Sequence, residues 1–213
     1  MSDDKIFAEK YFKVLNTELA GLNLTAIDDF EDFYAKQILD SINPLKIQSF
    51  YNNLTSAKAV VDIGFGGGFP ILPLAYKLPS QKFIGIESKR KKVDAVALIA
   101  DKLGIKNTKL LHYRLEEVNF DQNLVILSKA VMTVEKMLTN LNFTSDLLVY
   151  FYKGPNFLEL EADGLKKIEK NWELVENFPV EVPLTEKRIV VGFRNRFVPR
   201  GTTKKLVNLS AIL

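Results

Sequence analysis

The sequence predicts an α/β fold: a mostly parallel sheet of seven strands with an antiparallel terminal hairpin, preceded by an N-terminal helical extension. From Ala59 onward, short apolar runs alternate with amphipathic segments, a texture typical of βαβ units. The first apolar run ends at a glycine-rich turn. Beyond Trp172, two strand-like runs are separated only by a short linker that contains Pro183, which favours an antiparallel pair at the edge of the sheet.

The N-terminal part is expected to be helical. Residues 5–22 carry apolar side chains at close to helical spacing. A second helix is expected over about 29–42, with Asp28 or Asp29 as its N-cap and an end before the Asn-Pro pair. A third, short helix is expected over 47–54. The aromatic side chains of this region recur at helical spacing, which favours packing between helices over base stacking.

The remaining elements follow in order. We expect parallel strands at 59–63, 82–87, 108–112, 123–128 and 146–152. The helices between and after them are expected at 68–78, 89–103, 131–142 and 156–168. The terminal hairpin is expected to use 172–181 and 187–193. The chain therefore divides into a helical extension (1–56), a main domain (57–193) and a basic C-terminal tail (194–213), all in one structural unit.

Composition excludes several kinds of chemistry. The chain has no cysteine, so disulfides, thiolate metal sites and cysteine nucleophiles are excluded. With one histidine, His112, a multi-histidine metal site is impossible, and we expect no metal. No apolar run approaches roughly 18 residues, and the first residues lack the apolar core of a signal peptide. We therefore expect a cytoplasmic protein without membrane contact, and a monomer.

The first strand runs into a turn dense in glycine. Gly64, Gly66 and Gly68 follow Asp62, and an apolar segment restarts after Phe69. Glycine allows positive φ and close approach of the backbone, so such a turn can hold a nucleotide-like ligand against N–H groups at a helix N-terminus. The loop predicts a nucleotide-like ligand without saying which one.

Two carboxylates narrow the choice of ligand. Asp62 ends a buried strand, where a carboxylate needs a donor or a cation and would repel a pyrophosphate. Glu87 ends the second strand, about twenty residues past the loop, where a carboxylate can accept both ribose hydroxyls. A P-loop lysine is absent, and no glycine stands at position 69, which leaves an NAD-dependent oxidoreductase as a distant alternative. A ligand with a ribose and positive charge but no phosphate fits, and S-adenosylmethionine is such a ligand.

Several short blocks, in order along the chain, resemble one family. They are Asn23–Ile27, Lys36–Ser41, the glycine loop with its two prolines over Gly64–Pro73, Arg114–Glu117, Ser128–Ala130 and Tyr152–Gly154. They are similar to the motifs of the ribosomal RNA small-subunit methyltransferase G family, also called glucose-inhibited division protein B. The prolines and the N-terminal blocks are far more specific to this family than the glycines are.

The resemblance implies a Rossmann-like class I methyltransferase that moves the methyl group of S-adenosylmethionine to N7 of a guanine in 16S ribosomal RNA, leaving S-adenosylhomocysteine. It places Gly64 and Phe69 along the methionine and adenosine part of the cofactor. Leu115 and Glu116 would flank the adenine, and Lys129 would contact cofactor or substrate. Three departures from the family pattern are Lys129 for arginine, Gln37 for histidine and Ile71 for glycine.

The expected chemistry requires few catalytic side chains. N7 of guanine carries an in-plane lone pair, so attack on the sulfonium methyl requires no prior proton removal. Holding the two reactants in line supplies much of the rate. The base must also be exposed from the RNA structure to present N7. We therefore assign no general base and leave the catalytic residues unassigned.

Basic residues are the candidates for RNA contact. From Lys187 to Leu213 there are seven basic residues and no acidic one. Arg194, Arg196 and Arg200 interleave with Phe197, a pattern typical of a phosphate-binding arm. Lys153 ends a strand on the side where open α/β sheets bind ligands. The expected partner is 16S RNA or the small ribosomal subunit. A methyltransferase for another RNA or a small molecule, and a cofactor-binding module without activity, remain as alternatives.

Overall fold

The computed structural model describes residues 2–196 and 206–212. Its helical extension begins with α1 (Asp3–Thr17), shorter than the predicted helix over 5–22. A continuous helical stretch follows, composed of α2 (Phe30–Phe33), a π-helical segment η1 (Tyr34–Leu39) and α3 (Asp40–Ile42). It covers the second predicted helix, and the Asp29 side chain caps it by accepting from the Asp32 N–H at 2.9 Å. The extension ends with η2 (Asn43–Lys46) and α4 (Gln48–Ser56).

A seven-stranded sheet forms the centre of the molecule, in the order β3-β2-β1-β5-β7-β9-β8. Its strands are β1 (Val60–Ile63), β2 (Phe83–Glu87), β3 (Thr108–His112), β5 (Leu124–Lys129), β7 (Leu147–Lys153), β8 (Trp172–Val180) and β9 (Arg188–Asn195). The first five of these run parallel, while β9 is antiparallel to both β7 and β8. The predicted fold class, including the terminal antiparallel hairpin, is confirmed.

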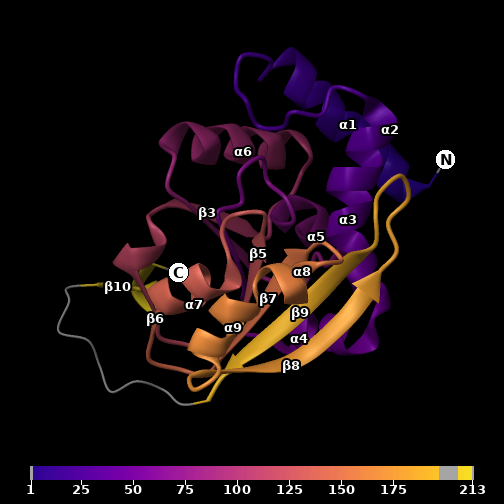
Figure 1. The fold of residues 1–213 in the computed structure, drawn as a ribbon. Coiled ribbons are helices and arrows are strands. Elements are labelled where there is room, and N and C mark those ends of the chain that lie inside the picture. Colours follow the sequence, from indigo (N-terminus) through magenta and orange to yellow (C-terminus); the bar gives the residue numbers. More distant parts are fainter. Residues whose placement is uncertain (1, 197–205, 213) are drawn as a thin grey trace.

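Helices cover both faces of this sheet (Figure 1). They are α5 (Ile71–Lys77), α6 (Arg90–Lys102), α7 (Val134–Asn140), α8 (Phe157–Leu160) and α9 (Ala162–Ile168). One core cluster joins α5, α6 and the N-terminal helices to side chains such as Val60 and Phe83. The other joins α7 and α9 to alternate positions of the same strands, such as Val61 and Ile84. This alternation is why each strand reads as a continuous apolar run.

A second, small sheet was not predicted. It pairs β4 (Val118–Phe120) with β6 (Asn142–Phe143) and with β10 (Val207–Asn208), all parallel. The short helix η3 (Leu115–Glu117) precedes β4, and η4 (Leu209–Ile212) follows β10. Strands of two or three residues carry too little periodicity to be recognised in a sequence.

The C-terminal segment differs from the expected tail. The strand β9 continues through Asn195, past the predicted boundary at 193. The Leu209 side chain is fully buried, and the Ser210 N–H donates to Asp121 Oδ1 at 3.0 Å. Thus the described residues 206–212 are part of the folded body, because their apolar side chains complete the core beside β4.

Candidate functional site

The carboxyl ends of four neighbouring strands form one edge of the sheet. Asp62 near the end of β1, Glu87 at the end of β2, Lys129 at the end of β5 and Lys153 at the end of β7 all lie there. Strand order reverses between β1 and β5, which is the switch point where open α/β sheets bind ligands. Four residues predicted from separate motifs are therefore brought to one edge.

The glycine loop between β1 and α5 uses backbone conformations that favour glycine. The φ angles of Gly64, Gly66 and Gly68 are +70°, +55° and +92°. A Cβ on Gly64 would lie 2.7 Å from a methyl carbon of Val131, which follows β5. Helix α5 begins at Ile71 rather than at 68, because the positive φ of Gly68 lies outside the α-helical region. The loop therefore passes close to the residues that follow β5.

Asp62 is fully buried at the base of this loop. Its Oδ2 accepts from the Ile71 N–H at 3.1 Å, at the start of α5. Its Oδ1 has no hydrogen-bond partner among the described residues. Burial raises the pKa of this carboxyl from 3.8 to about 8, although the Ile71 N–H and the charge of Lys129 oppose the rise. Asp62 thus has an unused acceptor oxygen that a donor or a cation would satisfy.

Glu87 faces the same loop. One carboxylate oxygen accepts from the Gly66 N–H at 3.2 Å, and the other accepts from the Lys89 N–H at 2.9 Å. These bonds hold the carboxylate at the end of β2, pointing to the loop. A carboxylate has about four acceptor positions, so acceptor capacity remains for ligand hydroxyls.

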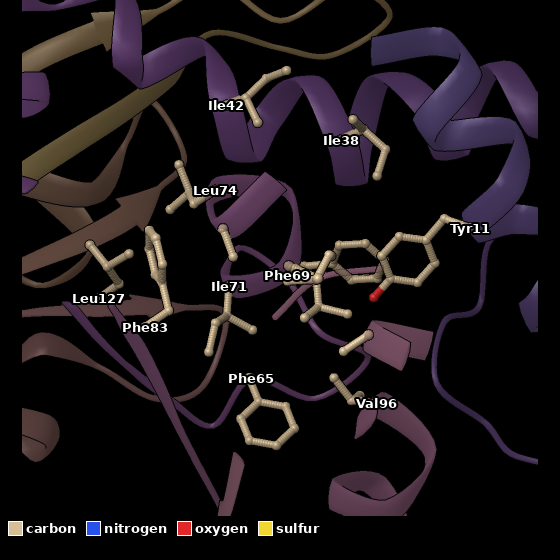
Figure 2. Packing of buried hydrophobic residues seen from close by; sticks show 14 of the residues in the cluster. Tyr11, Ile38, Ile42, Phe65, Phe69, Ile71, Leu74, Phe83, Val96 and Leu127 are labelled. Atoms are coloured by element: carbon tan, nitrogen blue, oxygen red, sulfur yellow. The ribbon is translucent and has the colours of Figure 1, made fainter. Parts of the chain in front are cut away.

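The N-terminal extension packs directly on the glycine loop. The Tyr11 hydroxyl donates to the Gly67 carbonyl at 2.6 Å, and both are buried. The Phe69 ring stacks on Tyr11 at 5.0 Å between centroids and meets the Phe33 ring edge-on at 5.7 Å. Figure 2 shows the Tyr11 and Phe69 rings side by side in this core. The predicted cofactor residue Phe69 therefore directs its ring toward the N-terminal helices, and its contact with a ligand stays a prediction.

Two cavities open on either side of the turn that follows β5. The small pocket has a volume of about 160 Å³. Its lining residues include Gly64, Ile86, Ser88, Leu115, Glu116 and Val131. The structure thus brings the predicted residues Leu115 and Glu116 to the end of the glycine loop. The other cavity, here called the charged pocket, has a volume of about 470 Å³ and is lined by Gln37, Asp40, Lys129, Tyr152, Lys153 and Arg188, among others.

Lys129 is held firmly in the charged pocket. Its Nζ lies 2.6 Å from Asp40 Oδ2. It also donates to the Lys36 carbonyl at 3.0 Å and to Gln37 Oε1 at 3.3 Å. Burial lowers the pKa of this ammonium, against the opposing charge of Asp40. The Lys36 carbonyl that accepts this bond belongs to the π-helical segment η1.

Lys153 is also engaged within the protein. Its Nζ lies 2.6 Å from Glu161 Oε1 and donates to the Met132 carbonyl at 3.3 Å. The second oxygen of Glu161 accepts from the Val134 N–H at the start of α7 at 2.6 Å. The side chain lines the charged pocket, but its charge is already balanced by Glu161.

The predicted arginines of the C-terminal stretch lie elsewhere. Arg194 pairs with Leu148 at the amino end of β7, so it stands at the sheet edge opposite to Lys129. Arg196 donates to the Glu169 carbonyl at 3.0 Å and lies 3.6 Å from a Glu173 oxygen. Arg200 lies outside the described residues. The structure therefore does not bring Arg194 and Arg196 to the edge that holds the other predicted residues.

The sequence does not point to Asp40 or Arg188 as site residues, and it predicts only helix packing for Tyr11, not the contact with the glycine loop. Asp40 stands inside the Lys36–Ser41 block, but nothing in a helical pattern shows that its carboxylate faces β5. Arg188 was counted only as part of a basic stretch. Only the tertiary contact of the N-terminal helices with the sheet reveals these side chains.

The strand order and the glycine loop define the class I, S-adenosylmethionine-dependent methyltransferase fold. The structure superposes on magnesium protoporphyrin IX methyltransferase from Synechocystis PCC 6803, solved with bound S-adenosylmethionine, with a TM-score of 0.58. That likeness covers 91% of this chain and 98% of the other, at 15% identity, and concerns the fold alone.

Sequence comparison gives the family. The family model described as rRNA small subunit methyltransferase G matches residues 5–190. Relatives named ribosomal RNA small subunit methyltransferase G include one from Lysinibacillus sphaericus, 29% identical over 92% of this chain and 84% of its own length. One from Listeria innocua is 29% identical over 96% of this chain and 89% of its own length. The chain belongs to the rRNA small subunit methyltransferase G family, as its motifs predicted, and is a methyltransferase.

The residues at the sheet edge fit S-adenosylmethionine. The unpartnered Asp62 Oδ1 suits a cationic amino group, and Glu87 can accept ribose hydroxyls. A Cβ on Gly64 would fill the narrow space between the glycine loop and the Val131 side chain. Within the described part of the chain, no cluster of three or more His, Cys, Asp or Glu could hold a metal ion. No helix among residues 2–196 and 206–212 is long and apolar enough to cross a membrane.

Proposed function

We propose that the protein transfers the methyl group of S-adenosylmethionine to N7 of a guanine in 16S ribosomal RNA, acting as a monomer in the cytoplasm on RNA of the small ribosomal subunit. The family supports an rRNA substrate. The observation that carries the proposal is the charged pocket, which shares the turn after β5 with the small pocket. A methyl donor on one side of that turn can face a base on the other.

The chain's own residues would hold the cofactor. S-adenosylmethionine supplies an electrophilic methyl group on a sulfonium centre. Glu87 accepts from the ribose hydroxyls, and Leu115 and Glu116 flank the adenine. The methionine part is held by the Asp62 carboxylate and by the backbone of Gly64, Gly66 and Gly68. Phe69 supports the loop by packing its ring against the N-terminal helices. Lys129, between Asp62 and Asp40, connects the cofactor side of the site with the substrate side.

No side chain has to remove a proton for this reaction. The N7 lone pair is available in neutral guanine, so the site contributes by bringing donor and acceptor into line. Methylated guanine is cationic, and the Asp40 carboxylate lies in the pocket that would receive it. A carboxylate in a poorly solvated pocket favours a developing positive charge.

RNA contact would extend beyond the pocket. Lys153 lines the pocket itself, while Arg194, Arg196 and Arg200 would contact phosphates farther along the RNA. Each phosphate contact adds to the dependence of binding on salt. The target guanine must leave its stack to enter the pocket.

Purified protein with labelled S-adenosylmethionine and 16S RNA, both free and in 30S particles, tests the proposal. Label should appear as N7-methylguanosine. Label on another base or position would refute the guanine-N7 assignment, and tight cofactor binding without any label would indicate a module without activity. The variant Glu87→Ala should weaken cofactor binding by about 1.5–3 kcal/mol, the range for charge-assisted hydrogen bonds.

A further inference from the structure

Asp40 occupies a central place in the charged pocket. The side chain is 6% exposed and comes from the N-terminal extension. Its Oδ2 lies 2.6 Å from Lys129 Nζ at the end of β5, and its Oδ1 lies 3.6 Å from Arg188 Nε at the start of β9. An anion and two cations from three distant parts of the chain thus meet in one cavity of about 470 Å³.

Arg188 is incompletely satisfied in this arrangement. Its Nε is buried and has no hydrogen-bond partner among the described residues. The 3.6 Å contact with Asp40 is an ion pair but too long for a good hydrogen bond. A buried N–H without an acceptor costs free energy, which a ligand acceptor placed beside Asp40 would recover.

Lys129, in contrast, has all its expected partners. Besides Asp40, it donates to the Lys36 carbonyl and to Gln37 Oε1. These bonds fix the ammonium and, through the ion pair, the orientation of the Asp40 carboxylate. Lys129 is therefore a positioning residue, and the groups with capacity for a ligand are the Asp40 oxygens and the Arg188 guanidinium.

Guanine presents a matching pattern on its Watson–Crick edge. That edge carries the O6 acceptor next to two donors, N1–H and the 2-amino group, whereas N7 lies beyond O6 on the adjacent Hoogsteen edge. Adenine presents a donor and then an acceptor, the reverse order. A cation beside a carboxylate therefore matches the acceptor and the donors of guanine. Binding through the Watson–Crick edge leaves N7 free to face the small pocket.

We propose that Asp40 and Arg188 select guanine: Asp40 accepts from N1–H and the 2-amino group, and Arg188 donates to O6. The inference rests on the proposed guanine-N7 reaction and adds its specificity determinants. A site built on hydrogen bonds rejects an analogue that leaves its buried polar groups unpaired, so this pair makes base choice strict.

Replacing the target guanine by inosine, which lacks the 2-amino group, tests the role of Asp40. With the unmodified protein, inosine should lower kcat/KM about tenfold or more, the effect of one charge-assisted hydrogen bond. In Asp40→Asn, Lys129 attracts the amide oxygen, so the amide N–H₂ faces the donors of guanine. This variant should lose on the order of 10–100-fold on guanine RNA and discriminate little between guanine and inosine.

Lys129→Met is the matched control. It removes the same ion pair, and with it the orientation that the ammonium gives to Asp40, but it keeps the carboxylate beside Arg188. Activity should therefore fall, while the guanine-to-inosine ratio should stay above that of Asp40→Asn. If Asp40 merely ties the extension to the sheet, both variants lose activity and both keep the full inosine penalty, which overturns the proposal. Cofactor affinity and unfolding of Asp40→Asn are measured in parallel.

Arg188→Gln gives a second, independent test if Asp40→Asn does not fold. 2-Aminopurine at the target position lacks both O6 and N1–H. In this variant its penalty should lose the part that comes from O6 and keep the part that comes from N1–H, so it should shrink without vanishing. An unchanged penalty contradicts the assignment of Arg188. The product made by the unmodified protein distinguishes a failure of the proposed function from a failure of this inference. Absence of N7-methylguanosine refutes the proposed function. If N7-methylguanosine is formed but the variants keep the base discrimination of the unmodified protein, only this inference is refuted.

Discussion

The two pockets beside the turn after β5 are built in different ways. The small pocket is formed by short segments at the ends of strands β1, β2, β3 and β5, and three of its residues, Gly64, Leu115 and Glu116, stand in motifs that the sequence shows. The charged pocket combines the π-helical region of the N-terminal extension with the ends of β5, β7 and β9. Under the proposed function, the residues that bind the cofactor come from short local motifs, whereas the residues that choose the substrate come from distant segments that pack together.

The glycine loop also depends on its contact with the N-terminal extension. The variant Gly68→Ala measures how much this contact contributes to the free energy of unfolding. A Cβ at this φ of +92° would overlap the Tyr11 hydroxyl and lie 3.1 Å from Val96. Backbone strain together with overpacking should lower the unfolding free energy by about 3 kcal/mol or more. Urea unfolding measures it, with Gly104→Ala as the control.

Gly104 has a similar φ of +69°, but nothing lies within 4 Å of its would-be Cβ. The control should therefore cost only the backbone strain, about 1–2 kcal/mol. Equal losses in the two variants would mean that the loop does not depend on the N-terminal extension.

The buried carboxyl of Asp62 gives the next largest effect, seen as a pH dependence. Its pKa is about 8 in the folded protein and 3.8 as the ordinary value, so between these pH values the folded state holds an extra proton. Its contribution to the unfolding free energy therefore falls as pH rises through this window, by at most about 1.4 kcal/mol per pH unit. Relative to Asp62→Asn, the unliganded protein should lose about 2 kcal/mol between roughly pH 5.5 and 7.5. Parallel curves for the two proteins would show that Asp62 is ionised throughout.

Tyr11→Phe tests the same contact between extension and loop more gently. It removes the donor to the Gly67 carbonyl, a buried bond of 2.6 Å, and leaves the carbonyl without this partner. The unfolding free energy should fall by about 1–2 kcal/mol, and affinity for S-adenosylmethionine should fall with it as the loop loosens. Tyr34→Phe is the control, because among residues 2–196 and 206–212 that hydroxyl has only an exposed 3.5 Å contact with Ser2. Lower stability with unchanged cofactor affinity would separate the extension from cofactor binding.

The sequence predicted most of the fold because strand and helix periodicity is local. Asp62 and Glu87 were recognisable since each follows an apolar run at a motif-defined distance from the loop. The small sheet was missed because its strands span only two or three residues. Asp40 was missed as a site residue for a different reason. Its carboxylate meets Lys129 of β5 and Arg188 of β9 only because a helix from the first fifth of the chain packs against these strands.

The smallest expected effect concerns the opposite edge of the sheet, where Arg194 is exposed. Deleting 194–213 is not a clean test, because it would remove the end of β9 and the buried Leu209. Arg194→Gln should weaken RNA binding modestly, lower the slope of log K against log salt by about one, and leave cofactor affinity unchanged. Arg188→Gln, at the pocket, should instead change base discrimination. If the salt slope of Arg194→Gln is unchanged, Arg194 does not contact RNA phosphates. RNA would then bind along the edge that carries the two pockets, because RNA with a base in the charged pocket reaches Arg194 only by wrapping around the sheet.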